Sequence, residues 1–259
     1  MDESRLKTSK RIFVCLSSKD RQTVVESIMY HIANFGFAMW YDRHKMLLGD
    51  KRNYKNFIEG IVQTEYAIVV MSKNSIESTC VAEEMEYLKK QYDIGLITIF
   101  PVFYKILPTE LPNSYQWLTD LVYKELDEKS GTLLTCNHII TKILNDELKK
   151  CKYQTLHELL NFLETHNQDK FITNMLRAYL EISGENHNAR ISILYSICTY
   201  LSVTMKDIEM FPQYYWKGFE RIFSYTKLNL ETDLRETLIL EIQTIILVNN
   251  LYFIFECPL

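Results

Sequence analysis

Short apolar runs alternate with helically spaced apolar positions through the first half of the chain. Compact runs rich in β-branched and aromatic residues occupy 11–16, 37–41, 66–71 and 96–104. Between them, as over 21–35, apolar residues recur every three or four positions. Such runs are typical of strands buried on both faces, and such spacing is typical of helices. The alternation predicts an α/β fold with parallel strands joined by right-handed crossovers.

The segment 65–90 shows the alternation most clearly. Its apolar run is followed by a polar turn at 72–75 and then by Ser78 and Thr79, which suit the N-terminal cap of a helix. Beyond the cap, one apolar stripe at helical spacing is formed by Val81, Met85 and Leu88. The segment therefore predicts a buried strand, a turn and an amphipathic helix.

Three carboxylates surround that stripe, at Glu83, Glu84 and Glu86. A carboxylate in the early turns of a helix that follows a buried strand lies where open α/β sheets bind their ligands. The same acids also suit a solvated helix face, because the helix dipole favours negative charge near the N-terminus. The residues alone support both interpretations.

The apolar spacing becomes helical throughout the second half of the chain. Amphipathic stripes occupy 156–163, 171–179, 191–201, 216–225 and 234–250. These stripes predict an all-α helical bundle with no internal repeat of fixed period. We therefore divide the chain into an N-terminal arm, an α/β domain and a C-terminal helical domain, at 1–10, 11–131 and 132–259. We expect the helical domain to regulate the α/β domain or to drive its assembly.

Composition excludes several classes of protein. The formal net charge of −4 gives no general attraction to nucleic acid. The six cysteines include no CxxC pair and the six histidines no HxxxH pair, so we expect reduced thiols and no metal site. The sequence has no G-x-G-x-x-G and no G-x-S-x-G, which argues against a Rossmann dinucleotide site and a serine hydrolase.

Hydropathy favours a cytoplasmic protein with no membrane partner. The charged N-terminal residues 1–11 lack the apolar segment of a secretory signal. The most apolar late run, 238–255, is interrupted by Glu241, Gln243 and two asparagines. A membrane span needs about 20 nearly uninterrupted apolar residues. We therefore expect this run to form a buried helix.

Four short motifs follow one another through the α/β half of the chain. They are Arg11-Ile-Phe-Val-Cys-Leu-Ser-Ser-Lys-Asp20, Trp40-Tyr-Asp42 with Leu48-Gly-Asp50, Ile68-Val-Val-Met-Ser72 with Asn74-Ser75, and Ser78-Thr-Cys-Val-Ala-Glu-Glu-Met85. In this order they resemble a TIR domain, the module of Toll/interleukin-1 receptors, plant immune receptors and bacterial defence proteins. With the helical half, the chain resembles the bacterial defence type (Thoeris-like). The resemblance implies a flavodoxin-like fold, a parallel sheet flanked by helices, followed by the all-α bundle.

The last motif departs from the family pattern S-x-W-V-x-x-E-[IL] at one position. Cys80 stands where the family commonly has tryptophan. Aligning Ser78 and Val81 with the pattern places the family's catalytic glutamate at Glu84. A shift by one residue makes Glu83 the match instead. The apolar stripe favours Glu84, because that register places Met85 at the family's apolar position.

The resemblance implies an NAD+ glycohydrolase or cyclase, since catalytic members of the family cleave NAD+ between nicotinamide and ribose. NAD+ is then the substrate, no cofactor is required, and the product is ADP-ribose or a cyclic ADP-ribose-type signal. The residues implied in substrate binding are Phe13, Ser17, Ser18, Lys19, Trp40, Asp42, Arg43 and Cys80. The alternatives without a binding role are an ordinary turn for the two serines, a solvated surface position for Lys19 and Arg43, and core packing for the aromatic residues.

The resemblance also implies a role in antiphage defence, in which such proteins deplete NAD+ or make a nucleotide signal for a downstream effector. It implies a homo-oligomer held by TIR–TIR and helical-domain contacts. Two other functions fit the sequence. A non-enzymatic TIR scaffold is favoured by Cys80, and a nucleoside deoxyribosyltransferase-like enzyme places a glutamate similarly on a related fold.

Overall fold

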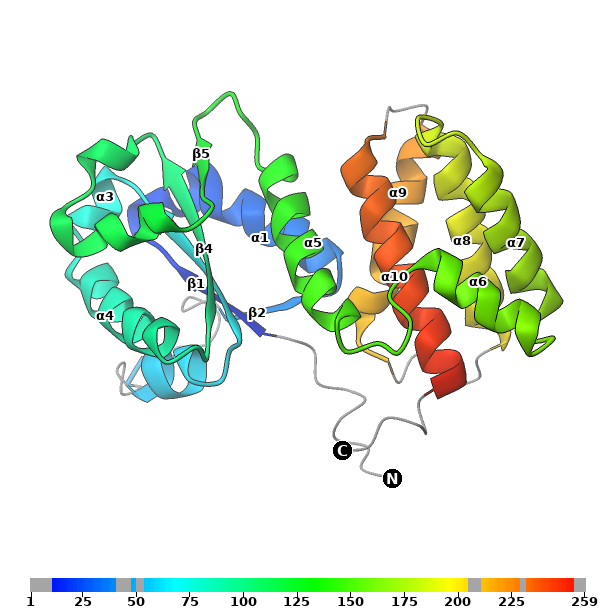
Figure 1. Ribbon diagram of the computed structural model, residues 1–259. Helices are drawn as coiled ribbons and strands as arrows, with labels where there is room; N and C mark the ends of the chain where they lie inside the picture. The colour runs from blue at the N-terminus through cyan, green and yellow to red at the C-terminus, as the bar shows by residue number, and fades with distance from the viewer. Residues whose placement is uncertain (1–10, 41–47, 50–53, 205–210, 229–231, 254–259) are drawn as a thin grey trace. The chain divides into compact units, whose positions relative to one another are not determined.

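The computed structural model describes residues 11–40, 48–49, 54–204, 211–228 and 232–253 (Figure 1). The chain divides into two compact units. The division falls between Cys136 and Asn137, except that Asn34–Gly36 group with the later unit. This division lies within α5 (Leu133–Leu148), slightly after the boundary that we drew from the sequence.

The earlier unit is built on a parallel sheet, whose order within the described residues is β2-β1-β3-β4-β5. The strands are β1 (Arg11–Cys15), β2 (Ala38–Trp40), β3 (Tyr66–Met71), β4 (Thr98–Tyr104) and β5 (Lys124–Leu126). Figure 1 shows α1 (Glu26–Asn34) and α4 (Thr79–Asp93) on opposite faces of this sheet. The α/β fold predicted from the sequence is confirmed.

The helices of this unit differ in detail from the sequence prediction. The helix expected over 21–35 begins as a 3-10 turn and a π-helical turn, η1 (Ser18–Asp20) and η2 (Arg21–Val25), before α1. A second π-helix, η3 (Tyr54–Ile61), precedes β3.

The polar turn predicted at 72–75 is wrong in one respect, because the chain there forms a short helix, α3 (Lys73–Ile76). The Ser72 side chain caps this helix by accepting a hydrogen bond from the Ser75 backbone N–H at 3.0 Å. A capping serine therefore turns the expected loop into a helical turn.

The core between the sheet and α4 contains alternate residues of the strands. Phe13 and Cys15 from β1 and Val69 from β3 belong to it, and so do Val81, Met85 and Leu88 from α4. All of these side chains are buried. Residues two apart on a strand share a face, so the predicted helical stripe packs against one face of the sheet as expected.

Several of the described elements were not predicted from the sequence. The strand β5 pairs with β4 through only three residues and carries charged Lys124 and Glu125, so it lacks the apolar run that marks the other strands. Two 3-10 segments, η4 (Pro108–Glu110) and η5 (Asn113–Asp120), lie between β4 and β5. The helix α5 was also missed, although Ile139, Ile140 and Ile143 follow helical spacing within it.

The later unit consists of helices throughout its described residues. They are the later part of α5, α6 (Leu156–Thr165), α7 (Lys170–Glu181), α8 (His187–Thr204), η7 (Gln213–Tyr215), α9 (Lys217–Lys227) and α10 (Leu234–Phe253). The stripes predicted from the sequence coincide with the last five of these α-helices. None of the described helices combines the length and apolar character that crossing a bilayer needs.

The helix α10 lies at the centre of this unit. It contacts α6, α8 and α9, and its residues 242–249 are all buried. A helix buried around its whole circumference is the central helix of a bundle. Its Glu241 accepts hydrogen bonds from the Tyr179 hydroxyl and, at 2.7 Å, from Arg190, so this polar contact fastens α7 and α8 to α10.

Candidate functional site

Glu84 is a buried carboxylate in the second turn of α4. Ser78 starts the helix by accepting a hydrogen bond from the Val81 backbone N–H at 3.3 Å. With that start, Glu84 follows Val81 by three residues and precedes Leu88 by four, so it lies within the apolar stripe. Its exposed fraction is 8%, against 0–2% for Val81, Met85 and Leu88, so Glu84 is buried with a small part accessible to solvent.

The neighbouring glutamates of α4 face the solvent. Glu83 is exposed, and Glu86 forms an exposed ion pair with Lys90 at 2.7 Å. The solvated helix face considered above therefore describes Glu83 and Glu86. Glu84 lies on the opposite side of the helix, among apolar residues, where a charge is costly to bury.

The thiol of Cys15 donates a hydrogen bond to the Glu84 carboxylate. Cys15 is the last residue of β1 and is fully buried. Burial raises the pKa of Cys15 well above 9.0, and the charge and hydrogen bond of Glu84 raise it further. The thiol therefore stays protonated and remains a donor at physiological pH. Burial also raises the pKa of Tyr115 in η5.

The raised pKa of Cys15 predicts a loss of stability at alkaline pH. The unfolded chain releases this proton near pH 8.5, whereas the folded chain retains it, so stability is complete below that pH and falls as pH rises toward the folded pKa. The slope from one such group reaches about 1.4 kcal/mol per pH unit. We expect Cys15→Ser to remove this contribution, because a serine hydroxyl does not titrate in this range.

Urea unfolding at pH 8 and pH 10 measures that difference. Other groups with raised pKa values, such as Tyr179 and Tyr215, are present in both proteins and cancel in the comparison. An equal change in stability between the two pH values for wild type and Cys15→Ser would contradict the assignment.

Phe13 and Trp40 belong to the same apolar cluster as Cys15. Both are buried, with exposed fractions of 1% and 5%. Gly60 packs so closely that a Cβ at its position would lie 2.7 Å from Trp40 Nε1 and 3.1 Å from Phe13 Cε2. The two aromatic residues therefore pack the interior around Gly60, and the Trp40 N–H meets no hydrogen-bond partner among the described residues.

The remaining predicted site residues are distributed differently. Cys80 is exposed in the first turn of α4, so it does not cover Glu84 as a tryptophan side chain there could. Ser17 is buried and caps η1, whereas Ser18 is exposed. Asp42 and Arg43 lie outside the described residues.

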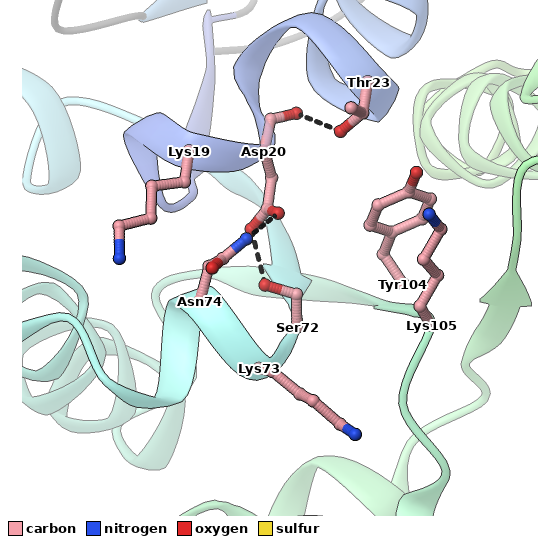
Figure 2. A pocket seen from close by; sticks show the side chains of 8 residues that line it. All are labelled: Lys19, Asp20, Thr23, Ser72, Lys73, Asn74, Tyr104 and Lys105. Atoms are coloured by element: carbon pink, nitrogen blue, oxygen red, sulfur yellow. Dashed lines mark hydrogen bonds between the residues drawn. The ribbon is translucent and has the colours of Figure 1, made fainter.

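Lys19 lines a pocket of about 220 Å³ at the carboxyl ends of three strands. Figure 2 shows the side chains that line it, which come from the end of β4 and from the segments after β1, β3 and β4: Lys19, Asp20, Thr23, Ser72, Lys73, Asn74, Tyr104 and Lys105. Of the predicted substrate-binding residues that the structure describes, Lys19 alone lines this pocket. Glu84 is not among them, so the predicted residues gather at two places.

Asp20 holds two of these segments together. Its carboxylate accepts hydrogen bonds from the Ser72 hydroxyl at 2.5 Å and from the Asn74 amide at 2.7 Å, and Asp20 is only 3% exposed. We did not single out Asp20, Ser72 or Asn74 as site residues from the sequence. The available signal was their position directly after neighbouring strands of a parallel sheet.

Among the described residues, no group of three His, Cys, Asp or Glu side chains could hold a metal ion. One place has the Glu84 carboxylate with the Cys15 thiol. The other has the Asp20 carboxylate with hydroxyl, amide and ammonium groups. Their chemistry is that of hydrogen bonding and charge stabilisation.

Comparison with known proteins identifies the earlier unit. The family model described as the TIR domain matches residues 12–133. This part of the chain is a TIR domain. The resemblance stated from the four motifs is thereby confirmed, and the TIR domain includes both Glu84 and the pocket at Lys19.

Several curated proteins match the TIR domain at low identity. The NAD(+) hydrolase TcpA of Theionarchaea archaeon (strain DG-70-1) is 30% identical over 101 residues, which is 39% of this chain and 30% of TcpA. The 2' cyclic ADP-D-ribose synthase BtTIR of Bacteroides thetaiotaomicron is 25% identical over 99 residues, covering 38% and 34% of the two chains. The chain thus spans about a third of the length of these relatives.

A further curated match is the probable 2' cyclic ADP-D-ribose synthase TcpB of Brucella melitensis biotype 1, 24% identical over 118 residues, with 46% of this chain and 47% of TcpB covered. Among solved structures, the TIR domain of the Toll-related receptor TRR-2 from Hydra magnipapillata has a TM-score of 0.35 and 20% identity, covering 44% of this chain and 82% of that one.

Proposed function

We propose that this TIR domain cleaves NAD+ at the bond between nicotinamide and ribose, with Glu84 as the catalytic carboxylate. The burial of Glu84 within an otherwise apolar stripe is the observation that carries the proposal. A stripe of this kind is most stable when apolar, and groups that deviate from such a pattern concentrate at functional sites. The relatives named as an NAD(+) hydrolase and a 2' cyclic ADP-D-ribose synthase support the same reaction class.

One carboxylate suffices for this reaction. Cleavage of a glycosidic bond develops positive charge on the ribose, and ordinary glycosidases add a second carboxyl group to protonate the leaving group. Nicotinamide leaves as a neutral molecule from a pyridinium, so no such acid is needed. The Glu84 carboxylate can stabilise the ribosyl cation, and its apolar surroundings strengthen that attraction.

The Cys15 thiol is a positioning group in this proposal. By donating to Glu84 it holds the carboxylate in place, and it does so as a neutral group that adds no competing charge. Phe13 and Trp40 pack the interior of the same cluster.

The nucleophile that completes the reaction determines the product. Attack by water gives ADP-ribose, and attack by a hydroxyl or adenine nitrogen of the same molecule gives a cyclic ADP-ribose-type product.

We further propose that the protein acts in the cytoplasm in antiphage defence, as a homo-oligomer with TIR–TIR and helical-domain contacts. In that role the reaction either makes a nucleotide signal for an effector or depletes the NAD+ of the cell.

Mass spectrometry after incubation with NAD+ tests the proposed reaction. We expect free nicotinamide together with an equal amount of ADP-ribose or a cyclic isomer. The assay should cover a wide range of protein concentration, because self-association raises activity if subunits complete one another's sites. No release of nicotinamide at any concentration would overturn the proposal.

A non-enzymatic scaffold is the second candidate, and the exposure of Cys80 favours it. Cys80 stands at the position that carries tryptophan in the family, and its exposed side chain does not shield the Glu84 carboxylate from solvent. The scaffold interpretation predicts concentration-dependent assembly in light scattering with no change in NAD+, so the same samples distinguish the two functions.

A further inference from the structure

The pocket at Lys19 lies at the switch point of the sheet. In the order β2-β1-β3-β4-β5, the chain builds outward in one direction from β1 and in the other from β3. The loops after β1 and β3 therefore separate to opposite faces and leave a crevice between them. Open α/β sheets bind their ligands in this crevice, outside the carboxyl ends of the strands. The pocket is formed by the end of β4 and by the segments after β1, β3 and β4 (Figure 2).

Positive charge predominates among the side chains that line the pocket. Three of them are lysines, Lys19, Lys73 and Lys105, and one, Asp20, is acidic. Both oxygens of the Asp20 carboxylate already accept hydrogen bonds, from Ser72 and Asn74. Asp20 is thus a structural anion satisfied within the protein, and the lysine ammonium groups provide the charge that a ligand meets.

The lysines have acidic neighbours that bind them weakly. Lys73 lies 4.0 Å from Glu110, and Lys105 forms an ion pair with Glu128. The lysine side chains are 75% and 47% exposed, and exposed ion pairs contribute little free energy. Figure 2 shows the three ammonium groups on different sides of the pocket, at the ends of long side chains that can turn toward an anion.

Lys105 has a backbone conformation that lysine rarely adopts. Its φ angle is +53°, in the left-handed region that favours glycine. This residue directly follows β4, and its backbone N–H donates to the Leu126 carbonyl at 2.9 Å. Backbone strain of this kind is concentrated at functional sites. The conformation places a cationic side chain at the pocket where glycine would be the stable choice.

We propose that this pocket is a binding site for a phosphoryl anion, separate from the carboxylate Glu84. The ligand is inorganic phosphate, a small phosphorylated molecule or the pyrophosphate of a dinucleotide, since all present the same group. Flexible ammonium groups bind phosphate as point charges, and the Tyr104 hydroxyl lines the same pocket. The Ser72 and Thr23 hydroxyls donate to Asp20 and shape the wall of the pocket. The site goes beyond the cleavage reaction, and its existence does not depend on that activity.

Isothermal titration of the full chain with inorganic phosphate tests the site. We expect Lys73→Gln and Lys105→Gln each to weaken phosphate binding about threefold, and the double variant about tenfold, as expected for exposed charge contacts that act independently. Binding should also weaken when the salt concentration rises, because salt screens exposed charges. The matched control is Lys89→Gln, which removes a partly exposed, ion-paired lysine of α4 that does not line the pocket.

A second variant separates charge from backbone strain. Lys105→Gly removes the ammonium group but suits the left-handed conformation. We expect it to weaken phosphate binding as much as Lys105→Gln does while raising the thermal midpoint. A misfolded variant would bind phosphate weakly and have a lower thermal midpoint. A variant that has lost only the charge would bind phosphate weakly and keep or raise its midpoint.

The source of the phosphoryl group is distinguished by titrating NAD+ into Glu84→Gln, in which turnover is expected to be about 10²- to 10³-fold slower. If Lys73→Gln and Lys105→Gln weaken NAD+ binding in this background, the pocket holds the pyrophosphate of the dinucleotide. If they weaken phosphate binding alone, it serves a separate phosphorylated ligand. The proposal is wrong if wild type binds no phosphate at about 10 mM, where even a weak site fills, or if the pocket variants bind as tightly as Lys89→Gln.

Discussion

Glu84→Gln is expected to slow NAD+ cleavage by about 10²- to 10³-fold, the usual effect of losing one preorganised group that stabilises charge in a transition state. Glutamine has nearly the same shape as glutamate and its amide oxygen can still accept the hydrogen bond of Cys15. The loss therefore reports the missing negative charge and not a disturbed core. Nicotinamide release, measured by mass spectrometry, follows the rate directly.

The same substitution should leave the thermal midpoint unchanged or raise it. A buried carboxylate is costly, and its replacement by a neutral group relieves that cost. Lower activity together with equal or higher stability is the expected signature of a residue retained for function. A structural residue would show the reverse, with stability lost and any remaining folded protein active.

Glu83→Gln is the matched control, because Glu83 lies on the same helix but is exposed. We expect this variant to keep wild-type activity. Full activity in Glu84→Gln with no activity in Glu83→Gln would show that the register of the last motif is shifted by one residue.

The α/β fold was predictable because its central strands are buried on both faces. Such strands appear in the sequence as continuous apolar runs, as β3 does over Tyr66–Met71, where every residue is buried. The strand β5 lacks this signal, because it lies at the edge of the sheet and carries Lys124 and Glu125. Its place depends on pairing with β4, which local sequence does not encode.

The position of Glu84 was predictable in part. The sequence placed it among three carboxylates around the apolar stripe, and the structure buries Glu84 within that stripe while Glu83 and Glu86 are exposed. The partner Cys15 was not identified, because it precedes Glu84 by 69 positions in the sequence and meets it only when α4 packs on the sheet. Phe13 and Trp40 were assigned to substrate binding, whereas the structure packs both in the interior.

The pocket at Lys19 could not be assembled from the sequence alone. Asp20 bonds to Ser72 and Asn74 across separations of 52 and 54 residues, and Lys105 lies further still along the chain. The sequence indicated that each of these residues follows a strand. Which strands are neighbours, and therefore which loops converge, is decided by the sheet order.

Asp20→Ala is expected to destabilise the TIR domain by about 3 kcal/mol. The substitution removes an acceptor that takes two hydrogen bonds in a buried position, and hydrogen bonds to a charged group contribute about 1.5–3 kcal/mol each. At this size of protein the thermal midpoint should fall by roughly 6–12 °C. Differential scanning calorimetry measures the change.

Asp93→Ala provides the comparison, because Asp93 is an exposed aspartate whose ion pair with Lys89 lies within α4. Pairs of that kind contribute about 0.5 kcal/mol or less. If Asp20→Ala lowers the midpoint no more than Asp93→Ala does, the contact between the segments after β1 and β3 is not what holds this edge of the sheet together.

A double-mutant cycle with Ser72→Ala isolates the contact itself. Ser72 also caps α3 through the Ser75 backbone N–H, so Ser72→Ala is costly for two reasons. The lost cap is common to both backgrounds and cancels in the cycle, whereas the bond to Asp20 is lost only once. We expect the two substitutions together to cost about 1–2 kcal/mol less than the sum of their separate effects. Additive effects, within about 0.3 kcal/mol, would mean that Asp20 and Ser72 stabilise the domain independently and that no bond between them joins the two segments.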